Sequence, residues 1–290
     1  MNQVADAWKD YECIDTGNGE KLERWKDVIL RRPDPQVIWP MKENEQWRHP
    51  HAHYHRSKSG GGHWEFKKKV KDSWTIQYRD LVFKVSPTGF KHTGLFPEQA
   101  ANWDVMRDLI ENAGREIRVL NLFAYTGGAT MACAKAGACE VVHVDASKGM
   151  VSWAKENMQL SHLEDKKIRF IVDDVLKFVQ REKRRGRTYH AIIMDPPSYG
   201  RGPNGEIWKI EEQLYPLIEA CLDILDENPL FFLVNSYTTG FPASVLHNVL
   251  QASVQAKYKR GYIEAGEIGL PITRSKTVLP CGIYGRWVNK

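Results

Sequence analysis

A polar segment follows a run of apolar residues in AIIMDPPSYG, residues 191–200. Prolines donate no backbone hydrogen bond and keep the preceding residue extended, so Asp195 and the carbonyl groups after it are presented as hydrogen-bond acceptors. A carboxylate and a carbonyl accept from N–H groups, and the ring of Tyr199 can stack on a flat base, for about 1–3 kcal/mol. The segment therefore predicts a binding site for a planar, nitrogen-containing substrate at the end of a strand.

A second candidate site lies earlier in the chain, in VLNLFAYTGGAT, residues 119–130. An apolar strand runs into a turn with two glycines and then into a helix, and glycines let a ligand approach the backbone closely. In a doubly wound sheet this first turn lies where ligands bind. The next strand ends at Asp145, whose carboxylate can accept from the two ribose hydroxyls of a nucleoside. A nicotinamide cofactor stays an alternative, although a GxGxxG pattern is absent.

The third strand, KIRFIVDD (residues 167–174), ends in two aspartates. Asp174 can accept from an adenine amino group, or it can cap the following helix. Its place in order after Asp145 favours the adenine contact.

Together, the glycine turn and the acidic strand ends resemble those of class I S-adenosylmethionine-dependent methyltransferases. More narrowly, RDLVFKVSPTGFKHTGLFPEQAANW (residues 79–103) and LNLFAYTGGAT (residues 120–130) are similar to bacterial 23S (large-subunit) ribosomal RNA methyltransferases. The resemblance covers residues 74–290. It implies S-adenosyl-L-methionine as cofactor, S-adenosyl-L-homocysteine as product and ribosomal RNA as partner.

The resemblance also implies which residues bind the cofactor and the acceptor. The cofactor-binding residues it implies are Phe96, Gln99, Asn121, Phe123, Tyr125, Thr126, Gly127, Asp145, Ala146 and Asp174. The catalytic, acceptor-binding residues it implies are Asp195, Pro196, Pro197 and Tyr199. No metal is expected.

Two departures from the family pattern bear on the substrate. Arginines normally follow the glutamine that matches Gln99, but Ala100 and Ala101 stand here. Methylation of cytosine C5 needs a thiolate after the fifth strand, where VNSYTTG (residues 234–240) offers hydroxyl groups that supply little nucleophile at neutral pH. Cys281 is interpreted as a buried structural cysteine. Transfer to a nitrogen is therefore favoured.

The elements that position these residues alternate between strands and helices from about residue 97 onward. This alternation predicts an α/β fold with a doubly wound, mostly parallel, seven-stranded sheet. The earlier part is rich in Trp, His, Pro and Gly, with short strand-like pieces such as QVIW (residues 36–39). We expect a small β-rich domain over residues 1–73 and a methyltransferase domain over residues 74–290 that begins with a connecting hairpin, residues 74–96.

Two further local patterns are interpreted from composition. EIWKIEEQLYPLIEACLDIL (residues 206–225) predicts one continuous helix, and SKSGGG (residues 57–62) predicts a flexible joint.

The bulk composition is that of an ordinary globular protein, with 42% hydrophobic and 27% charged residues among 290. No apolar run approaches the roughly 18 residues of a membrane span, and the start lacks the apolar core of a secretion signal, so we expect a cytoplasmic protein without a membrane partner. Five scattered cysteines predict neither a disulfide framework nor a zinc site. The net charge of +5 fits an RNA partner, with basic clusters at residues 66–71, 181–187 and 257–260.

Histidines gather near the start of the chain, at residues 49, 51, 53, 55 and 63. In an extended strand the first four would share one face. Pro50 interrupts the pattern and no acidic or thiol ligand lies between the histidines, so we predict a polar loop or an RNA-facing surface, with Tyr54, Arg56 and Lys58, rather than a metal site.

The sequence thus predicts a methyltransferase that modifies a base of ribosomal RNA at a nitrogen. Three alternatives stay open: a methyltransferase of a small molecule or protein side chain, a nicotinamide-dependent oxidoreductase, and a non-catalytic RNA-binding module. A monomer and a homodimer are both compatible with the sequence.

Overall fold

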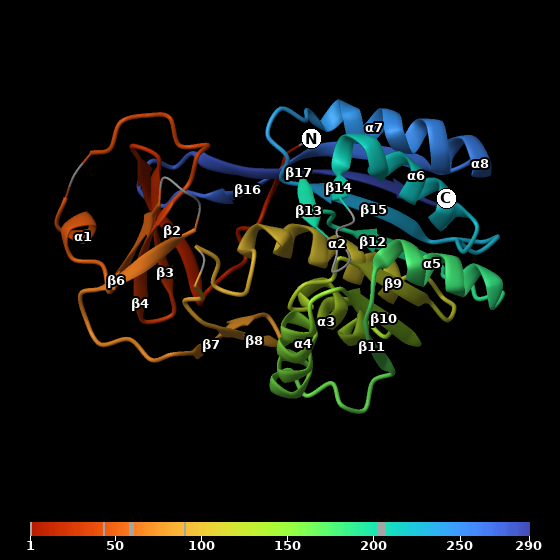
Figure 1. The fold of residues 1–290 in the computed structure, drawn as a ribbon, viewed down its shortest axis with the longest axis horizontal. Coiled ribbons are helices and arrows are strands. Elements are labelled where there is room, and N and C mark those ends of the chain that lie inside the picture. Colours follow the sequence, from red (N-terminus) through yellow and green to blue (C-terminus); the bar gives the residue numbers. More distant parts are fainter. Residues whose placement is uncertain (1, 43, 58–60, 90, 202–206) are drawn as a thin grey trace. The chain divides into compact units, whose positions relative to one another are not determined.

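The computed structural model describes residues 2–42, 44–57, 61–89, 91–201 and 207–290 (Figure 1). The chain falls into two compact units, each described by itself. The larger unit comprises Met1–Gln3, Asn102–Ile268 and Gly282–Lys290, and the smaller unit comprises Val4–Ala101 and Gly269–Cys281. The domain boundary expected between residues 73 and 74 stays a prediction.

An eight-stranded sheet forms the centre of the larger unit, in the order β1-β16-β17-β15-β12-β9-β10-β11. Five strands run parallel to one another: β9 (Arg118–Leu122), β10 (Glu140–Asp145), β11 (Ile168–Val172), β12 (Ala191–Met194) and β15 (Phe231–Ser236). β17 (Val278–Val288) pairs antiparallel with β15 and lies between β15 and β16 (Tyr262–Pro271). The predicted fold is confirmed, and the two-residue β1 (Gln3–Val4) adds an eighth strand.

The connections between strands change direction at β9. The chain passes from β9 to β10 and β11 on one side, and then to β12 on the other side of β9. The carboxyl ends of β9 and β12 therefore meet at a topological switch point, where open α/β sheets bind their ligands. All four residues of β12 are buried, because helices cover both faces of the sheet.

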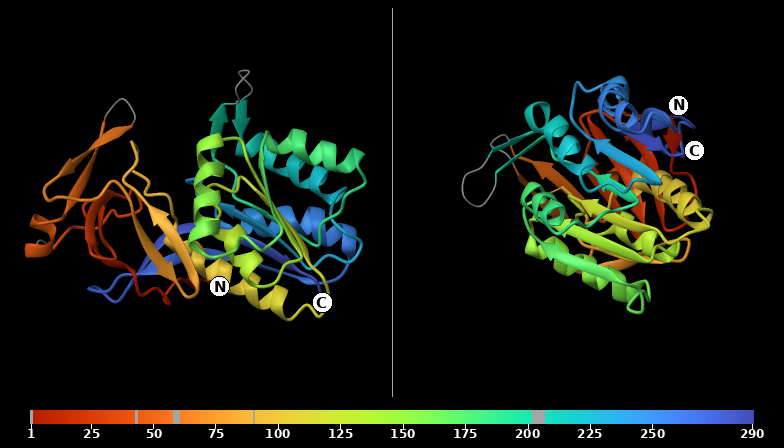
Figure 2. Two further views of the ribbon diagram at one scale, coloured as in Figure 1. Left: turned by 90° about the horizontal axis from the view of Figure 1, so that it is seen from below. Right: turned by 90° about the vertical axis from the view of Figure 1, so that its right-hand side faces the viewer.

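Helices lie on both faces of this sheet (Figure 2). One face packs against α5 (Val175–Arg184), α6 (Ile210–Leu222) and α7 (Ala243–Leu250), and the π-helix Gln251–Gln255 and α8 (Ala256–Tyr258) follow α7. The strand residues facing these helices, such as Leu120 and Ile192, belong to the same apolar core. The opposite face holds α3 (Gly128–Lys135), with α2 (Ala100–Glu111) and α4 (Lys148–Leu160) beside it.

The smaller unit is rich in strands, which confirms the β-rich N-terminal region. Its five-stranded sheet contains β2 (Tyr11–Gly17), β3 (Glu20–Trp25), β4 (Val28–Pro33), β5 (Ala52–Arg56) and β6 (Gly62–Phe66). A separate hairpin consists of β7 (Trp74–Tyr78) and β8 (Leu81–Val85). Two short helices, α1 (Glu45–Arg48) and η1 (Pro97–Gln99), complete the unit.

Two local predictions are wrong, and a third holds only in part. QVIW forms no strand, because Val37 donates from its backbone to Asp34 in a turn and Ile38 is 90% exposed. The helix expected over residues 206–225 begins only at Ile210, and the residues before it form β14 (Ile207–Lys209), which pairs with β13 (Tyr199–Arg201). Of the clustered histidines, His49 ends α1, whereas His53 and His55 lie in β5 and His63 lies in β6, so these three are in strands and not in a loop, and the alternative of an RNA-facing surface stays a prediction. Residues 58–60 of the predicted joint, with Lys58, lie outside the described residues.

Two further expectations concern membrane-spanning helices and disulfides. Within the part of the chain that the structure describes, no helix is long and apolar enough to cross a membrane. All five cysteines are described, and each is a free thiol.

Candidate cofactor and acceptor site

The turn between β9 and α3 has an unusual backbone. Phe123 (φ 53°) and Tyr125 (φ 51°) lie in the left-handed region together with Gly127 (φ 85°). Bulky residues rarely adopt this conformation, and such strain concentrates at ligand sites. Hydrogen bonds hold the turn in place: Ala124 N donates to the Val144 carbonyl at 3.0 Å, and the buried Asn157 Nδ2 of α4 donates to the Thr126 carbonyl at 2.8 Å.

The carboxylate of Asp145, at the end of β10, is fixed by two backbone groups. Tyr125 N donates to Oδ2 at 2.9 Å and Ser147 N donates to Oδ1 at 2.8 Å. Each carboxylate oxygen can accept a second hydrogen bond, and the half-buried side chain is followed by the exposed Ala146. The structure thus brings the acid at the end of β10 against the turn at the end of β9, as a nucleoside site requires.

The two aspartates at the end of β11 make different contacts. Asp174 caps α5, because its Oδ1 accepts from Lys177 N at 2.9 Å, and its side chain is exposed. Asp173 accepts from Asp174 N and pairs with Arg181. Its backbone N donates to the Asp145 carbonyl at 3.1 Å, which joins the ends of β10 and β11. The capping interpretation of Asp174 is therefore correct, and its adenine contact stays a prediction.

Asn121 belongs to a buried polar network behind the turn. Its Nδ2 donates to Thr130 Oγ1 at 3.0 Å, and Thr130 Oγ1 lies 2.9 Å from His143 Nδ1. Burial lowers the pKa of His143 to about 3, an effect that the backbone of Tyr125 only partly offsets, so the imidazole is neutral. The side chain of Asn121 thus contacts α3, and its predicted cofactor contact is not tested by this geometry.

The segment after β12 leads from the sheet to a short hairpin. Asp195 is half-buried, Pro196 is buried, and Pro197 and Tyr199 are exposed, with 52% of Tyr199 accessible. No donor in the described part of the chain hydrogen-bonds the Pro196 carbonyl. About half of Tyr199 is accessible, and this residue follows Asp195 and Pro196 closely in the chain.

Two residues that the sequence did not suggest hold this segment. Trp208 Nε1 of β14 donates to the Pro197 carbonyl at 2.6 Å, and its ring lies 5.2 Å from that of Phe123 in the β9–α3 turn. Thr238, after β15, shares a hydrogen bond with Ser198 at 2.7 Å between their hydroxyl oxygens. The ends of β9, β12 and β15 are thereby joined.

Two predicted cofactor residues lie in the smaller unit. Gln99 is buried within η1, and Phe96 caps that helix. Their predicted role, closing over the cofactor, stays a prediction.

The cysteines do not supply a nucleophile. Burial raises the pKa of Cys133 to about 12 and raises that of Cys221 still further. In the smaller unit, burial raises the pKa of Cys281, whose thiol donates to the Leu279 carbonyl at 3.5 Å. Ser236, the last residue of β15, is buried and begins the segment where the family resemblance would place a catalytic thiol. Burial therefore disfavours the thiolate form of these three cysteines, and the structural role expected for Cys281, which is of intermediate exposure, stays a prediction.

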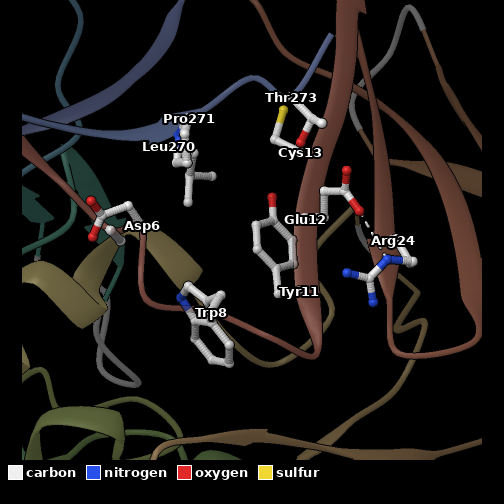
Figure 3. A pocket seen from close by; sticks show the side chains of 10 residues that line it. Asp6, Trp8, Tyr11, Glu12, Cys13, Arg24, Leu270, Pro271 and Thr273 are labelled. Carbon is white, nitrogen blue, oxygen red and sulfur yellow. Dashed lines mark hydrogen bonds and ion pairs between the residues drawn. The ribbon is translucent and has the colours of Figure 1, made fainter. Parts of the chain in front are cut away.

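A cavity of about 220 Å³ lies in the smaller unit, lined by residues that include Trp8, Tyr11 and Cys13 (Figure 3). Its Arg24 is already paired with Glu12 at 3.0 Å. None of the predicted site residues lines this cavity, so we assign it no role.

The parallel order of β15-β12-β9-β10-β11, with an acid after β10 and a polar acceptor segment after β12, defines a class I methyltransferase arrangement. Residues 24–212 match the family described as S-adenosylmethionine-dependent methyltransferase, and the chain belongs to this family. Its cofactor is S-adenosylmethionine. Because the chain belongs to this family, the alternative of a nicotinamide-dependent oxidoreductase is wrong.

Known proteins agree with this assignment. The S-adenosylmethionine-dependent methyltransferase from Agrobacterium tumefaciens is 35% identical, with a TM-score of 0.93 over 100% of this chain and 94% of that one. The protein SMU.776, described as a methyltransferase complexed with SAH, is 17% identical over 97% of this chain and 76% of that one, with a TM-score of 0.74, and shows the fold alone. The ribosomal RNA large subunit methyltransferase K/L of Shewanella frigidimarina is 29% identical over 78% of this chain. This chain spans about a third (31%) of that relative's length.

The residues present fit the family's cofactor. Asp145 offers carboxylate oxygens with remaining acceptor capacity for ribose hydroxyls, and the exposed carboxylate of Asp174 can accept from an amino group. These hydrogen-bond acceptors are compatible with the hydroxyl and amino groups of a nucleoside.

Proposed function

We propose that the protein transfers a methyl group to a nitrogen of a base in ribosomal RNA. The observation that supports this acceptor best is the segment after β12, where the exposed Tyr199 follows Asp195 and two prolines beside the turn after β9. The K/L relatives, named as ribosomal RNA methyltransferases, support the same substrate. An RNA acceptor also agrees with the cytoplasmic location expected from the sequence.

In this proposal the cofactor binds at the ends of β9, β10 and β11. Asp145 accepts from the ribose hydroxyls and Asp174 from the adenine amino group. The other cofactor-binding residues of the proposal are Phe96, Gln99, Asn121, Phe123, Tyr125, Thr126, Gly127 and Ala146. When bound, S-adenosylmethionine supplies a methyl group on a sulfonium, which is its own leaving group.

The chain's own residues orient the acceptor. The carboxylate of Asp195 and the carbonyl of Pro196 accept from the N–H groups of the base, which aims the lone pair of the attacking nitrogen. Tyr199 stacks on the base, and Pro197 keeps the segment rigid. Such positioning supplies much of the rate enhancement in a displacement reaction. A nitrogen acceptor needs no thiolate, in agreement with the raised pKa values of the cysteines.

Two substitutions test this assignment, one on the acceptor side of the site and one on the cofactor side. Asp195→Asn should abolish transfer to unmodified 23S RNA while S-adenosylmethionine affinity in calorimetry stays within about twofold, because that carboxylate serves the acceptor. Asp145→Ala should weaken cofactor affinity by about 10- to 100-fold, since a hydrogen bond to a charged group contributes about 1.5–3 kcal/mol. Nucleoside mass spectrometry should find the methyl group on a base nitrogen.

Three results would contradict the proposal. Full turnover by the Asp195 variant would remove that residue from the site, and unchanged affinity of the Asp145 variant would remove the ribose contact. Methylation of small molecules or proteins, with RNA left unmodified, would assign the site to another class of acceptor.

A further inference from the structure

Four potential metal ligands share one face of the sheet in the smaller unit. His53 and His55 alternate along β5, so their side chains point to the same side. In the neighbouring β6, Glu65 lies opposite His53 and His63 lies opposite His55. The acidic ligand that the linear sequence lacks between its histidines is thus supplied by the adjacent strand.

Three of these side chains converge closely. The ligand atoms of His53, His55 and Glu65 all lie within 4.8 Å of one another. His55 Nε2 is 2.8 Å from Glu65 Oε2, and the rings of His53 and His55 are 3.9 Å apart between centroids. Ligand atoms of one tetrahedral ion with bonds of about 2.0–2.1 Å lie slightly more than 3 Å apart.

A carboxylate also orients one of the histidines from behind. His53 Nε2 lies 2.7 Å from Glu20 Oε1 of β3, and Glu20 is in turn paired with Arg31 of β4. Both His53 and Glu20 are largely buried, with side-chain exposures of 12% and 17%. An imidazole whose second nitrogen binds a carboxylate is the usual support of a metal-binding histidine.

We propose that His53, His55 and Glu65 bind one divalent transition-metal ion, for which Zn²⁺ is the probe. Two imidazole nitrogens and one carboxylate oxygen favour Zn²⁺, Ni²⁺ or Cu²⁺ over Mg²⁺ and Ca²⁺, which prefer oxygen ligands. Three protein ligands leave a coordination position that water fills. His63, whose ring centroid lies 5.3 Å from that of His55, is a neighbour of the site and not one of its ligands.

Metal binding to the full chain without an affinity tag tests the proposal. Calorimetric titration with ZnSO₄ should show one equivalent bound, and titration with CoCl₂ should give the visible absorption bands of a low-symmetry cobalt site. His55→Ala and Glu65→Gln should each lower the Zn²⁺ affinity at least tenfold. Both side chains are about half exposed, at 40% and 48%, so these variants should fold.

Two further variants separate this site from general binding to surface histidines. His49→Ala, an exposed histidine outside the cluster, should leave the affinity unchanged, whereas Glu20→Gln should lower it by about 10- to 100-fold through the orientation of His53. Equal Zn²⁺ affinity in the parent protein and in the His55 and Glu65 variants would overturn the proposal. So would affinity for Mg²⁺ matching that for Zn²⁺, or no Zn²⁺ binding below millimolar concentration.

Discussion

At the scale of single residues, the site depends on side chains that hold other groups in place. Asp145 accepts from two backbone N–H groups, Asn157 holds the Thr126 carbonyl, and Trp208 holds the Pro197 carbonyl. A strained turn such as that after β9 persists only where its surroundings fix it. These three residues therefore fix the backbone of the turn and of the acceptor segment in place.

The buried His143 predicts a specific pH dependence of stability. Burial lowers its pKa to about 3 in the folded protein, against about 6.5 in the unfolded chain. Between these values the unfolded chain binds more protons, so the free energy of unfolding falls as pH falls, by about 1.4 kcal/mol per unit. The stabilisation is complete above about pH 6.5, and about 2 kcal/mol of it should be lost by pH 5.

Denaturant unfolding at pH 7, 6 and 5 measures this contribution. His143→Gln should be less stable at pH 7 but should show a shallower pH dependence than the parent protein, while the exposed His49→Gln should follow the parent. Parallel curves for all three proteins would mean that another group carries the dependence.

At the scale of elements, the close packing of α2 on α3 depends on one glycine. A Cβ added at Gly128, the first residue of α3, would lie 2.5 Å from Cζ2 of Trp103 in α2. Because real Cβ atoms never approach so closely, the tryptophan or the helix must move, and overpacking of this kind costs about 1–3 kcal/mol.

A pair of substitutions tests this packing. Gly128→Ala should lower the free energy of unfolding by that amount, and displacement of α3 should also weaken S-adenosylmethionine binding. Gly149→Ala in α4 is the matched control, because its Cβ would meet nothing closer than Ser147 Oγ at 3.9 Å, and it should stabilise by no more than about 0.5–1 kcal/mol, since Gly149 lies in the first turn of the helix. Equal effects of the two variants would show that helix propensity, and not contact with Trp103, decides the outcome.

The sequence predicted the elements whose patterns are long and regular. Apolar runs ending in Asp145, Asp174 and Asp195 placed these acids at strand ends, because β10 and β12 are buried and even the edge strand β11, which is partly buried, keeps an apolar pattern. It could not predict the contact of Trp208 with Pro197, because β14 has three residues and its apolar pattern merges with that of α6. Nor could it predict the proximity of Glu65 to His55, which depends on the pairing of two strands rather than on spacing along one.

At the scale of the whole molecule, the three basic clusters differ in whether their side chains already interact with other groups of the chain. In the second cluster, Arg181, Lys183 and Arg187 form ion pairs with acidic residues of the same chain. In the third, Lys257 and Arg260 donate to backbone carbonyls. The exposed lysines of residues 66–71 make no ion pair with the described residues and are the best candidates for phosphate contacts.

This difference predicts the salt dependence of RNA binding. The double substitution Lys68→Gln, Lys69→Gln should weaken RNA binding and reduce the slope of log affinity against log salt by about 1.4–1.8, the counterion release of two phosphate contacts. Lys166→Gln with Lys183→Gln removes the same charge elsewhere and should leave the slope nearly unchanged. Filter binding at several salt concentrations measures both slopes, and equal slopes would show that only net charge matters.

The place of β17 in the sheet bears on how the protein folds. This strand follows β16 in the chain, yet it is inserted between β16 and β15. Before β17 pairs with it, the mainly apolar strand β15 (FFLVNS) has one edge without a hydrogen-bonding partner. Free strand edges of this kind pair with other chains. Because pairing between strands distant in the sequence is slow, intermediates with this free edge can aggregate during folding. Refolding should give its best yield in dilute solution, where the β16–β17 hairpin reaches β15 before a second molecule does.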